Sequence, residues 1–287
     1  MNKRWKRSRH WKSFKELLGN NIAKTGMILV ILFFLTGILA PWLAPYDPDE
    51  QDFSIALSVP SSKHPLGTDE FGRDILSRII YGARPTLIIT LTATVIGLVI
   101  GGGLGVISAY HGGMIDAVIM RSLDVLLAFP GILLALAIIS GIGPGMKGVV
   151  IAISIYSIPQ FARISRGSVL GIKENDYIMA ARATGEGTWS IIFRYILPNA
   201  MMPIIAFTFL RIATVIIISA SLSFLGVGVQ PPTAEWGVML SQGRKYIRMS
   251  PFLSIFPGIA IIIVVLGFNL LGDSLRDALD PKFRKDN

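Results

Sequence analysis

The chain has 287 residues, of which 52% are hydrophobic and 16% are charged, and its formal net charge is +9. An average soluble domain carries about 25% charged residues, so this composition argues against a soluble globular protein and favours a membrane protein. The chain has no cysteine, which excludes a disulfide framework and a thiolate site.

The N-terminal segment, residues 1–25, is strongly basic, with eight Lys or Arg and one acidic residue. Basic residues beside a first span keep that end of the chain in the cytoplasm. We therefore interpret the segment as a topology signal and lipid-surface anchor rather than a nucleic-acid-binding segment. Residues 26–44 follow as the first apolar block. This block is longer than the 7–15 residues of a signal-peptide core, and we expect it to be retained as a transmembrane helix.

The next segment, residues 45–83, is acidic, with seven Asp or Glu and three Lys or Arg. This balance fits an extracytoplasmic loop. Two interpretations stay open. The loop is either a packed cap over the membrane bundle or a surface that docks an external protein.

Five more apolar blocks follow, and a span needs about 20 predominantly apolar residues. They cover residues 86–110, 124–142, 148–165, 201–227 and 252–271, inside a membrane domain of residues 84–273, and residues 274–287 form a cytoplasmic tail. The sequence thus predicts an all-α membrane protein with six transmembrane helices. Proline removes a backbone donor inside a helix, so kinks are predicted at Pro130, Pro159 and Pro257.

Small residues recur every four positions in the second block, at Gly97, Gly101 and Gly105. Inside an apolar span this spacing favours close helix packing. A phosphate-binding loop would need a preceding strand, and the chain contains no GxxxxGK[ST] motif.

Charged residues near the span ends are candidates for structural or gating roles. Asp116, Arg121 and Asp124 bracket the start of the third block, and we expect Arg121 to pair with one of the two acids. Such a pair would anchor the helix or act as a gate latch. Arg211 lies ten residues into the fifth block. Three positions stay open for it: the translocation path, a partner helix, or the interface reached by snorkelling.

Residues 176–199 form a polar, turn-broken segment between apolar blocks, which we interpret as two short helices. Asn175 or Asp176 can cap the first and Thr188 the second, Gly185 and Gly187 can break the chain between them, and Pro198 follows the end of the second. An i, i+3, i+4, i+7 pattern predicts one apolar stripe, made of Trp189, Ile192, Phe193 and Ile196. Such a hairpin is expected to bind either the bilayer surface or a groove on a partner protein.

The hairpin residues Ala180, Ala181, Gly185, Leu197 and Pro198 keep the order and spacing of the EAA loop of permease subunits in ATP-binding-cassette importers. Met179 departs from that pattern in place of the glutamate, and Tyr195 in place of an isoleucine. Other short motifs of the chain are HPLGTD (64–69), GRD (72–74), GAR (82–84), AFP (128–130), LSFLG (222–226), PP (231–232) and EWG (235–237). With these motifs, the chain from about residue 46 to residue 281 resembles the C-type permease of dipeptide and oligopeptide importers.

The resemblance implies a fold, partners and a mechanism. It implies the type I importer permease fold in the cytoplasmic (inner) membrane of a bacterium, with both termini in the cytoplasm. The chain would form half of the path for dipeptides or oligopeptides beside a second, B-type permease. Two separate P-loop ATPases would bind ATP and Mg²⁺, leaving this chain without a cofactor, and an external binding protein would deliver the cargo. The hairpin, with Trp189 and Phe193, would couple to the ATPases.

Three alternatives stay open. A nickel or glutathione permease would have the same plan. An ion-coupled secondary carrier usually places an acid near the middle of a span, but residues 86–110, 201–227 and 252–271 contain no Asp or Glu. A membrane enzyme would need a catalytic or metal motif, and the chain has no HExxH or GxSxG motif.

Overall fold

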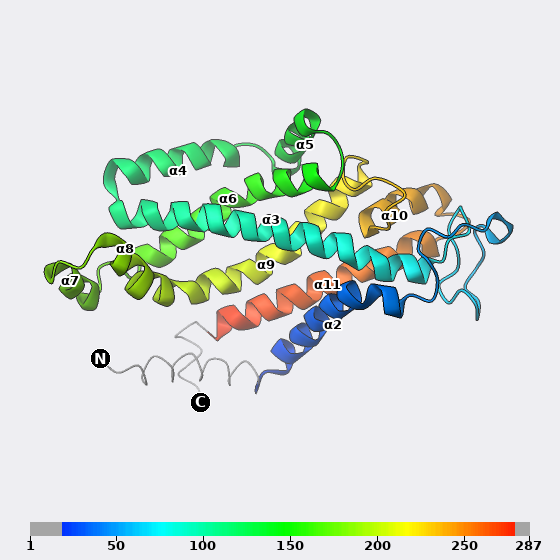
Figure 1. The fold of residues 1–287 in the computed structure, drawn as a ribbon, viewed down its shortest axis with the longest axis horizontal. Helices are drawn as coiled ribbons and strands as arrows, with labels where there is room; N and C mark the ends of the chain where they lie inside the picture. Colours follow the sequence, from blue (N-terminus) through cyan, green and yellow to red (C-terminus); the bar gives the residue numbers. More distant parts are fainter. Residues whose placement is uncertain (1–18, 279–287) are drawn as a thin grey trace.

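The structure is a computed structural model that describes residues 19–278, and helices dominate it (Figure 1). In this range the extended backbone pairs at one isolated bridge, between Thr68 and Asp74. The helical elements, in chain order, are α2 (Asn21–Leu43), η1 (Phe53–Ile55), α3 (Ile75–His111), α4 (Gly113–Leu127), α5 (Gly131–Ile142), α6 (Met146–Leu170), α7 (Asp176–Ala183), α8 (Thr188–Ile191), η2 (Ile192–Ile196), α9 (Leu197–Phe224), α10 (Trp236–Gly243), η3 (Arg244–Tyr246) and α11 (Phe252–Asp277). Residues 1–18 of the expected basic segment and 279–287 of the expected tail lie outside the described residues.

The all-α membrane class predicted from the sequence is confirmed. Five helical stretches in the described range are long and apolar enough to span a membrane, and the bent pair α4–α5 brings the number to six if it counts as one span. The five are α2, α3, α6, the stretch Thr188–Phe224 and α11. The kink expected at Pro130 is confirmed by that bend, whereas Pro159 and Pro257 lie inside the uninterrupted helices α6 and α11.

The third span differs from the expected block of residues 124–142. The helix already begins at Gly113, ends at Leu127 and resumes at Gly131, and the two parts meet at 89°. Proline disfavours the helical conformation in the residue before it and cannot donate to the preceding turn. Pro130 therefore ends α4 and starts α5 in a new direction.

The second span is also longer than the expected residues 86–110. It begins at Ile75, where the Asp74 carboxylate accepts a hydrogen bond of 2.7 Å from the Ser77 amide and so caps the helix. At about 1.5 Å per residue, the 37 residues of α3 reach roughly 55 Å, well beyond a bilayer core of about 30 Å. The helix thus links the outer loop to the opposite end of the bundle.

Helices α3 and α6 lie side by side (Figure 1), and the glycine face of α3 packs against α6. A Cβ atom at Gly97 would approach the Ser157 Cβ to 2.7 Å, and one at Gly101 would overlap the Ile158 carbonyl oxygen. A Cβ atom at Gly105 would likewise overlap the Ala162 carbonyl oxygen. The three glycines thus permit a backbone approach that any side chain would prevent.

The loop between α2 and α3 and the loop between α9 and α10 form one packed cap at the end of the bundle opposite α7 and α8 (Figure 1). Arg78 is 1% exposed and donates to the carbonyl oxygens of Pro48 (2.8 Å) and Pro232 (3.2 Å). The indole nitrogen of Trp236 donates to the Ile79 carbonyl oxygen at 2.9 Å. These bonds join both loops to the start of α3 and support the interpretation of residues 45–83 as a cap.

Candidate functional site

The first helix of the candidate coupling hairpin, α7, ends in a glycine-dependent turn. The Gly185 amide donates to the Arg182 carbonyl oxygen (3.0 Å), and the Glu186 amide donates to the Ala181 carbonyl oxygen (3.1 Å). This pair of bonds is the Schellman motif, which requires a left-handed residue after the helix. Gly185 has φ +77°, a conformation that L side chains rarely adopt. The turn therefore selects glycine at position 185.

The second helix of the hairpin differs from the expectation in two ways. Its cap residue is Gly187 rather than Thr188, which is the first residue of α8. The helix also does not end at Pro198, because α8 continues through the π-helical turn η2 into α9. A proline ring clashes with the carbonyl four residues back, and a wider π turn gives it room. The hairpin helix is thus continuous with the fifth span.

The inner face of the hairpin is anchored to the bundle. Ile178 and Ile196 are fully buried in one cluster with Val106 of α3. The Arg182 guanidinium lies 5.0 Å from the centre of the Tyr110 ring. The Lys173 Nζ atom, before α7, donates to the Ala109 carbonyl oxygen at 3.0 Å. These contacts with the end of α3 hold the hairpin against that helix.

The outer face of the hairpin exposes two aromatic rings. Trp189 is 62% exposed and Phe193 is 64% exposed, and their ring centroids lie 6.1 Å apart in a stacked arrangement. Ile192 and Ile196, expected on the same stripe, are instead buried. The predicted single stripe is therefore wrong, and the apolar side chains divide between an inner and an outer face.

The remaining EAA-like residues divide in the same way. Ala180 and Pro198 are exposed, Ala181 is buried and Leu197 is half-buried. Met179, where the resemblance expects a glutamate, is 52% exposed. The exposed surface of the hairpin thus combines apolar side chains, namely Met179 and the Trp189–Phe193 pair, with charged ones such as Arg182 and Arg194.

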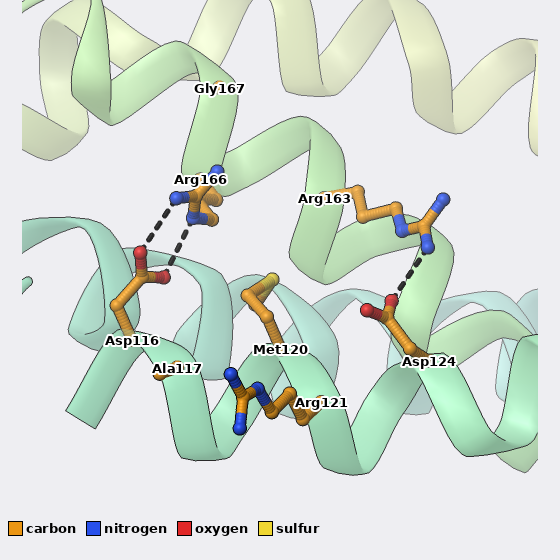
Figure 2. A pocket seen from close by; sticks show the side chains of 8 residues that line it. All are labelled: Asp116, Ala117, Met120, Arg121, Asp124, Arg163, Arg166 and Gly167. Atoms are coloured by element: carbon orange, nitrogen blue, oxygen red, sulfur yellow. Dashed lines mark hydrogen bonds and ion pairs between the residues drawn. The ribbon is translucent and has the colours of Figure 1, made fainter. Parts of the chain in front are cut away.

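A groove of about 440 Å³ separates α4 from α6, with charged side chains on both walls (Figure 2). Asp116 and Arg166 form a bidentate pair, with nitrogen–oxygen distances of 2.7 and 2.6 Å. Asp124 and Arg163 pair at 2.6 Å. The expected pairing of Arg121 with an acid is wrong. Both acids lie on the face of α4 that meets α6, so the α6 arginines reach them instead.

Sequence spacing did not reveal these pairs, because Arg163 and Arg166 are separated from their partners by 39 and 50 positions. Only the interruption of the fourth apolar block by two arginines hinted at a polar role. Across the described residues, Arg121 makes no ion pair.

Arg211 is buried at 5% exposure between α9 and α6. Its guanidinium carbon lies 4.9 Å from the centre of the Tyr156 ring, and a nitrogen lies 3.5 Å from the Ser157 hydroxyl. The residue therefore faces a neighbouring helix of the same chain and does not snorkel. Guanidinium stacking on an aromatic face partly replaces the solvation that burial removes.

Two family models match the chain. Residues 101–285 match "Binding-protein-dependent transport system inner membrane component". Residues 8–61 match "N-terminal TM domain of oligopeptide transport permease C".

Curated relatives match nearly the whole chain. A glutathione transport system permease protein GsiD from Pectobacterium atrosepticum is 46% identical over 276 residues, covering 96% of this chain and 92% of the relative. A dipeptide transport system permease protein DppC from Alkalihalophilus pseudofirmus is also 46% identical, covering 96% and 90%.

Solved structures share the fold at low sequence identity. The inward-facing MetNI methionine ABC transporter matches with a TM-score of 0.59 at 19% identity, over 71% of this chain and 97% of that chain. An amino acid ABC transporter matches with a TM-score of 0.53 at 20% identity, over 69% and 92%.

Proposed function

This chain belongs to the family of binding-protein-dependent transport system inner membrane components, and from that membership we propose that it forms half of the transmembrane path for short peptides. It is a permease subunit of an ATP-binding-cassette importer and a multi-pass membrane protein. The substrate is proposed to be a dipeptide, an oligopeptide or glutathione. Two relatives, named for dipeptide and glutathione transport, match at the same 46% identity.

The partners we propose follow from the division of labour in such importers. A second, B-type permease would complete the path, and an extracytoplasmic binding protein would deliver the peptide. Two P-loop ATPases would bind ATP and Mg²⁺, because this chain contains no GxxxxGK[ST] motif. In the described part of the chain, no three His, Asp or Glu side chains are grouped to hold a metal ion.

The observation that carries the mechanism is the exposed Trp189–Phe193 pair on a helix that continues to Phe224. An exposed aromatic pair on an amphipathic helix is suited to a hydrophobic groove on a partner. A helix is stiff along its axis, so displacement of the hairpin by an ATPase would move α9 with it. ATP binding can shift the bundle only through contacts that differ between its two states. We place those contacts at this hairpin.

We propose that both termini are cytoplasmic. The basic N-terminal segment supports this orientation, and so does the acidic balance of residues 45–83. The hairpin then faces the cytoplasm, and the cap built on Arg78 and Trp236 lies at the opposite end of the bundle (Figure 1). We therefore propose that the ATPases bind on the cytoplasmic side and that the peptide is delivered on the opposite side of the membrane.

Uptake by the reconstituted importer tests this function. Vesicles with the complete importer and ATP should accumulate a labelled dipeptide or glutathione only when the binding protein is present. Replacing ATP with a non-hydrolysable analogue should abolish accumulation. Uptake that persists without ATP and collapses with the ion gradient would instead identify a secondary carrier, and selective uptake of Ni²⁺ would identify a nickel permease.

A further inference from the structure

The groove between α4 and α6 has more positively than negatively charged side chains. Three arginines and two aspartates line it, which gives a formal charge of +1. Arg163 and Arg166 each hold one aspartate, and Arg121 has no acidic partner among the described residues. Figure 2 shows Arg121 on α4 beside Met120, with no marked contact to the paired residues. The groove therefore has one guanidinium available.

The groove is open at the surface of this chain. The Asp124 and Arg163 side chains are 53% and 57% exposed although they lie within apolar spans. Arg163 is seven residues before the end of α6 at Leu170. Charged side chains within membrane spans are costly against hydrocarbon and usually face the bundle interior or a water-filled cavity. The groove is thus best placed along the aqueous path rather than against lipid.

We infer that this groove is a substrate-binding site along the translocation path, where the free carboxylate of a short peptide binds Arg121. The inference rests on the proposed function and names the group of the substrate that this permease contacts. A volume of about 440 Å³ falls within the usual range of small-molecule sites, about 300–1,000 Å³. The guanidinium fork matches a carboxylate in geometry and charge.

The charge pattern favours a carboxylate over the phosphate of a lipid headgroup. Phosphate recognition usually gathers several unneutralised cations. Here the two aspartates neutralise two of the three arginines and would repel a doubly charged group. One available cation is the complement of a single free carboxylate.

The decisive measurement is uptake by the complete importer in vesicles. Substrates are dialanine and its C-terminal amide, and glutathione and its diethyl ester. Arg121→Gln should lower kcat/KM for the free acids about tenfold, the effect of losing one charge-assisted hydrogen bond, and should change that for the amide and ester less than about twofold. The binding protein treats the parent and the variant alike, so the change in the acid-to-amide ratio belongs to the permease. The pair that responds shows whether the permease contacts a carboxylate of dialanine or of glutathione.

Two further variants test the sign of the effect and its dependence on the positive charge. Asp124→Asn releases Arg163 and should lower KM for the free acids about threefold, the opposite sign. Arg121→Lys should retain most of the discrimination because it keeps the charge. Arg248→Gln, which removes an exposed arginine of the outer loop, is the matched control and should leave the ratio unchanged.

Several outcomes would overturn the inference while peptide uptake by the parent upholds the proposed function. One is an unchanged acid-to-amide ratio in Arg121→Gln. Another is an equal loss for acid and amide, which would mark Arg121 as structural. A third is an effect of Arg121→Gln that appears only in vesicles with phosphatidylglycerol, which would identify a lipid headgroup site. A parent importer that transports neither peptide would contradict both proposals.

Discussion

The rings of Trp189 and Phe193 stack with centroids 6.1 Å apart, and each side chain is more than 60% exposed. On the same turns of the helix, Ile191 and Ile192 are almost fully buried against the bundle. The hairpin therefore has its own anchored face, and the aromatic pair is not needed to hold it. Burial of a large apolar side chain stabilises a complex by about 1.5–3 kcal/mol, so we expect this pair to be buried at an interface with a partner.

Replacing Trp189 and Phe193 with Ala should weaken ATPase docking by a few kcal/mol, since both rings lose their burial at the interface. The variant should reach the membrane at normal abundance because neither ring supports the core. Co-purification of the ATPases and ATP hydrolysis stimulated by the binding protein measure the effect.

Trp42→Ala provides the control, because Trp42 is 78% exposed on α2, away from the hairpin. It should leave ATPase co-purification unchanged. If the double variant keeps its ATPases and transports like the parent, the hairpin is a helix lying on the bilayer surface and the coupling assignment is wrong.

Gly185→Val should disrupt the same hairpin through the backbone. Position 185 has φ +77°, where a β-branched residue is strongly disfavoured. We expect a loss of about 1–3 kcal/mol in the local stability of the hairpin. Hydrogen exchange in residues 176–196 should become faster, and coupled ATP hydrolysis should fall.

Gly187→Ala is the matched control in the same turn. Gly187 has φ −66° and no atom near the position of a Cβ. Alanine therefore fits this backbone without strain and should change the stability by less than about 1 kcal/mol. Equal behaviour of the two variants would show that the left-handed turn at Gly185 is not important for coupling.

The membrane class and most of the spans could be predicted from the sequence, because long apolar blocks and proline positions act locally. The hairpin and its glycine turn could be predicted for the same reason. The π turn at Ile192–Ile196 could not, since a regular period of 3.6 residues does not contain it. The same period predicts Trp189 and Ile192 on one stripe, whereas Ile192 is buried against the bundle and Trp189 is exposed.

The charged pairs could not be predicted, because they depend on how α4 lies against α6. Asp116 and Arg121 are close in sequence, yet the partner of Asp116 is Arg166, 50 positions away. Arg211 likewise finds Tyr156 only because α9 crosses α6. Contacts between helices need the tertiary arrangement, which apolar periodicity alone does not contain.

Glu235 gives the outer cap a predicted pH dependence. The side chain is 1% exposed and accepts a 3.0 Å hydrogen bond from the Val238 amide at the start of α10. Burial raises the pKa of Glu235 above its ordinary value. The unfolded carboxyl therefore loses its proton first, so stability falls as pH rises from the unfolded pKa of about 4.3 through the raised folded pKa.

Glu235→Gln keeps an acceptor oxygen for the Val238 amide and removes the buried charge. The melting temperature of the purified parent should fall between about pH 4 and the raised pKa, whereas that of the variant should change less. Identical pH profiles for the two proteins would contradict this account of Glu235.

Membrane orientation can be tested with cysteines introduced into this cysteine-free chain. Ser61 lies exposed in the outer loop and Thr188 lies exposed at the start of α8. An impermeant thiol reagent on intact cells should label Ser61→Cys and not Thr188→Cys, because the basic N-terminus fixes the orientation. After the membrane is permeabilised, both positions should be labelled. Labelling of Thr188→Cys in intact cells would reverse the topology.

The contact between α3 and α6 should be the most sensitive packing site in the bundle. At Gly101 even a Cβ atom would overlap the Ile158 carbonyl oxygen, whereas Gly103, two residues later in the same helix, has open space. Gly101→Leu should therefore cost at least about 1–3 kcal/mol through overpacking, and Gly103→Leu should cost much less. The melting temperature of the purified permease pair would measure both. Equal melting temperatures for the two variants would mean that α3 and α6 do not pack through this glycine face. A selective loss for Gly101→Leu would establish that close backbone contact holds α6, and with it Arg163 and Arg166, in place beside the groove.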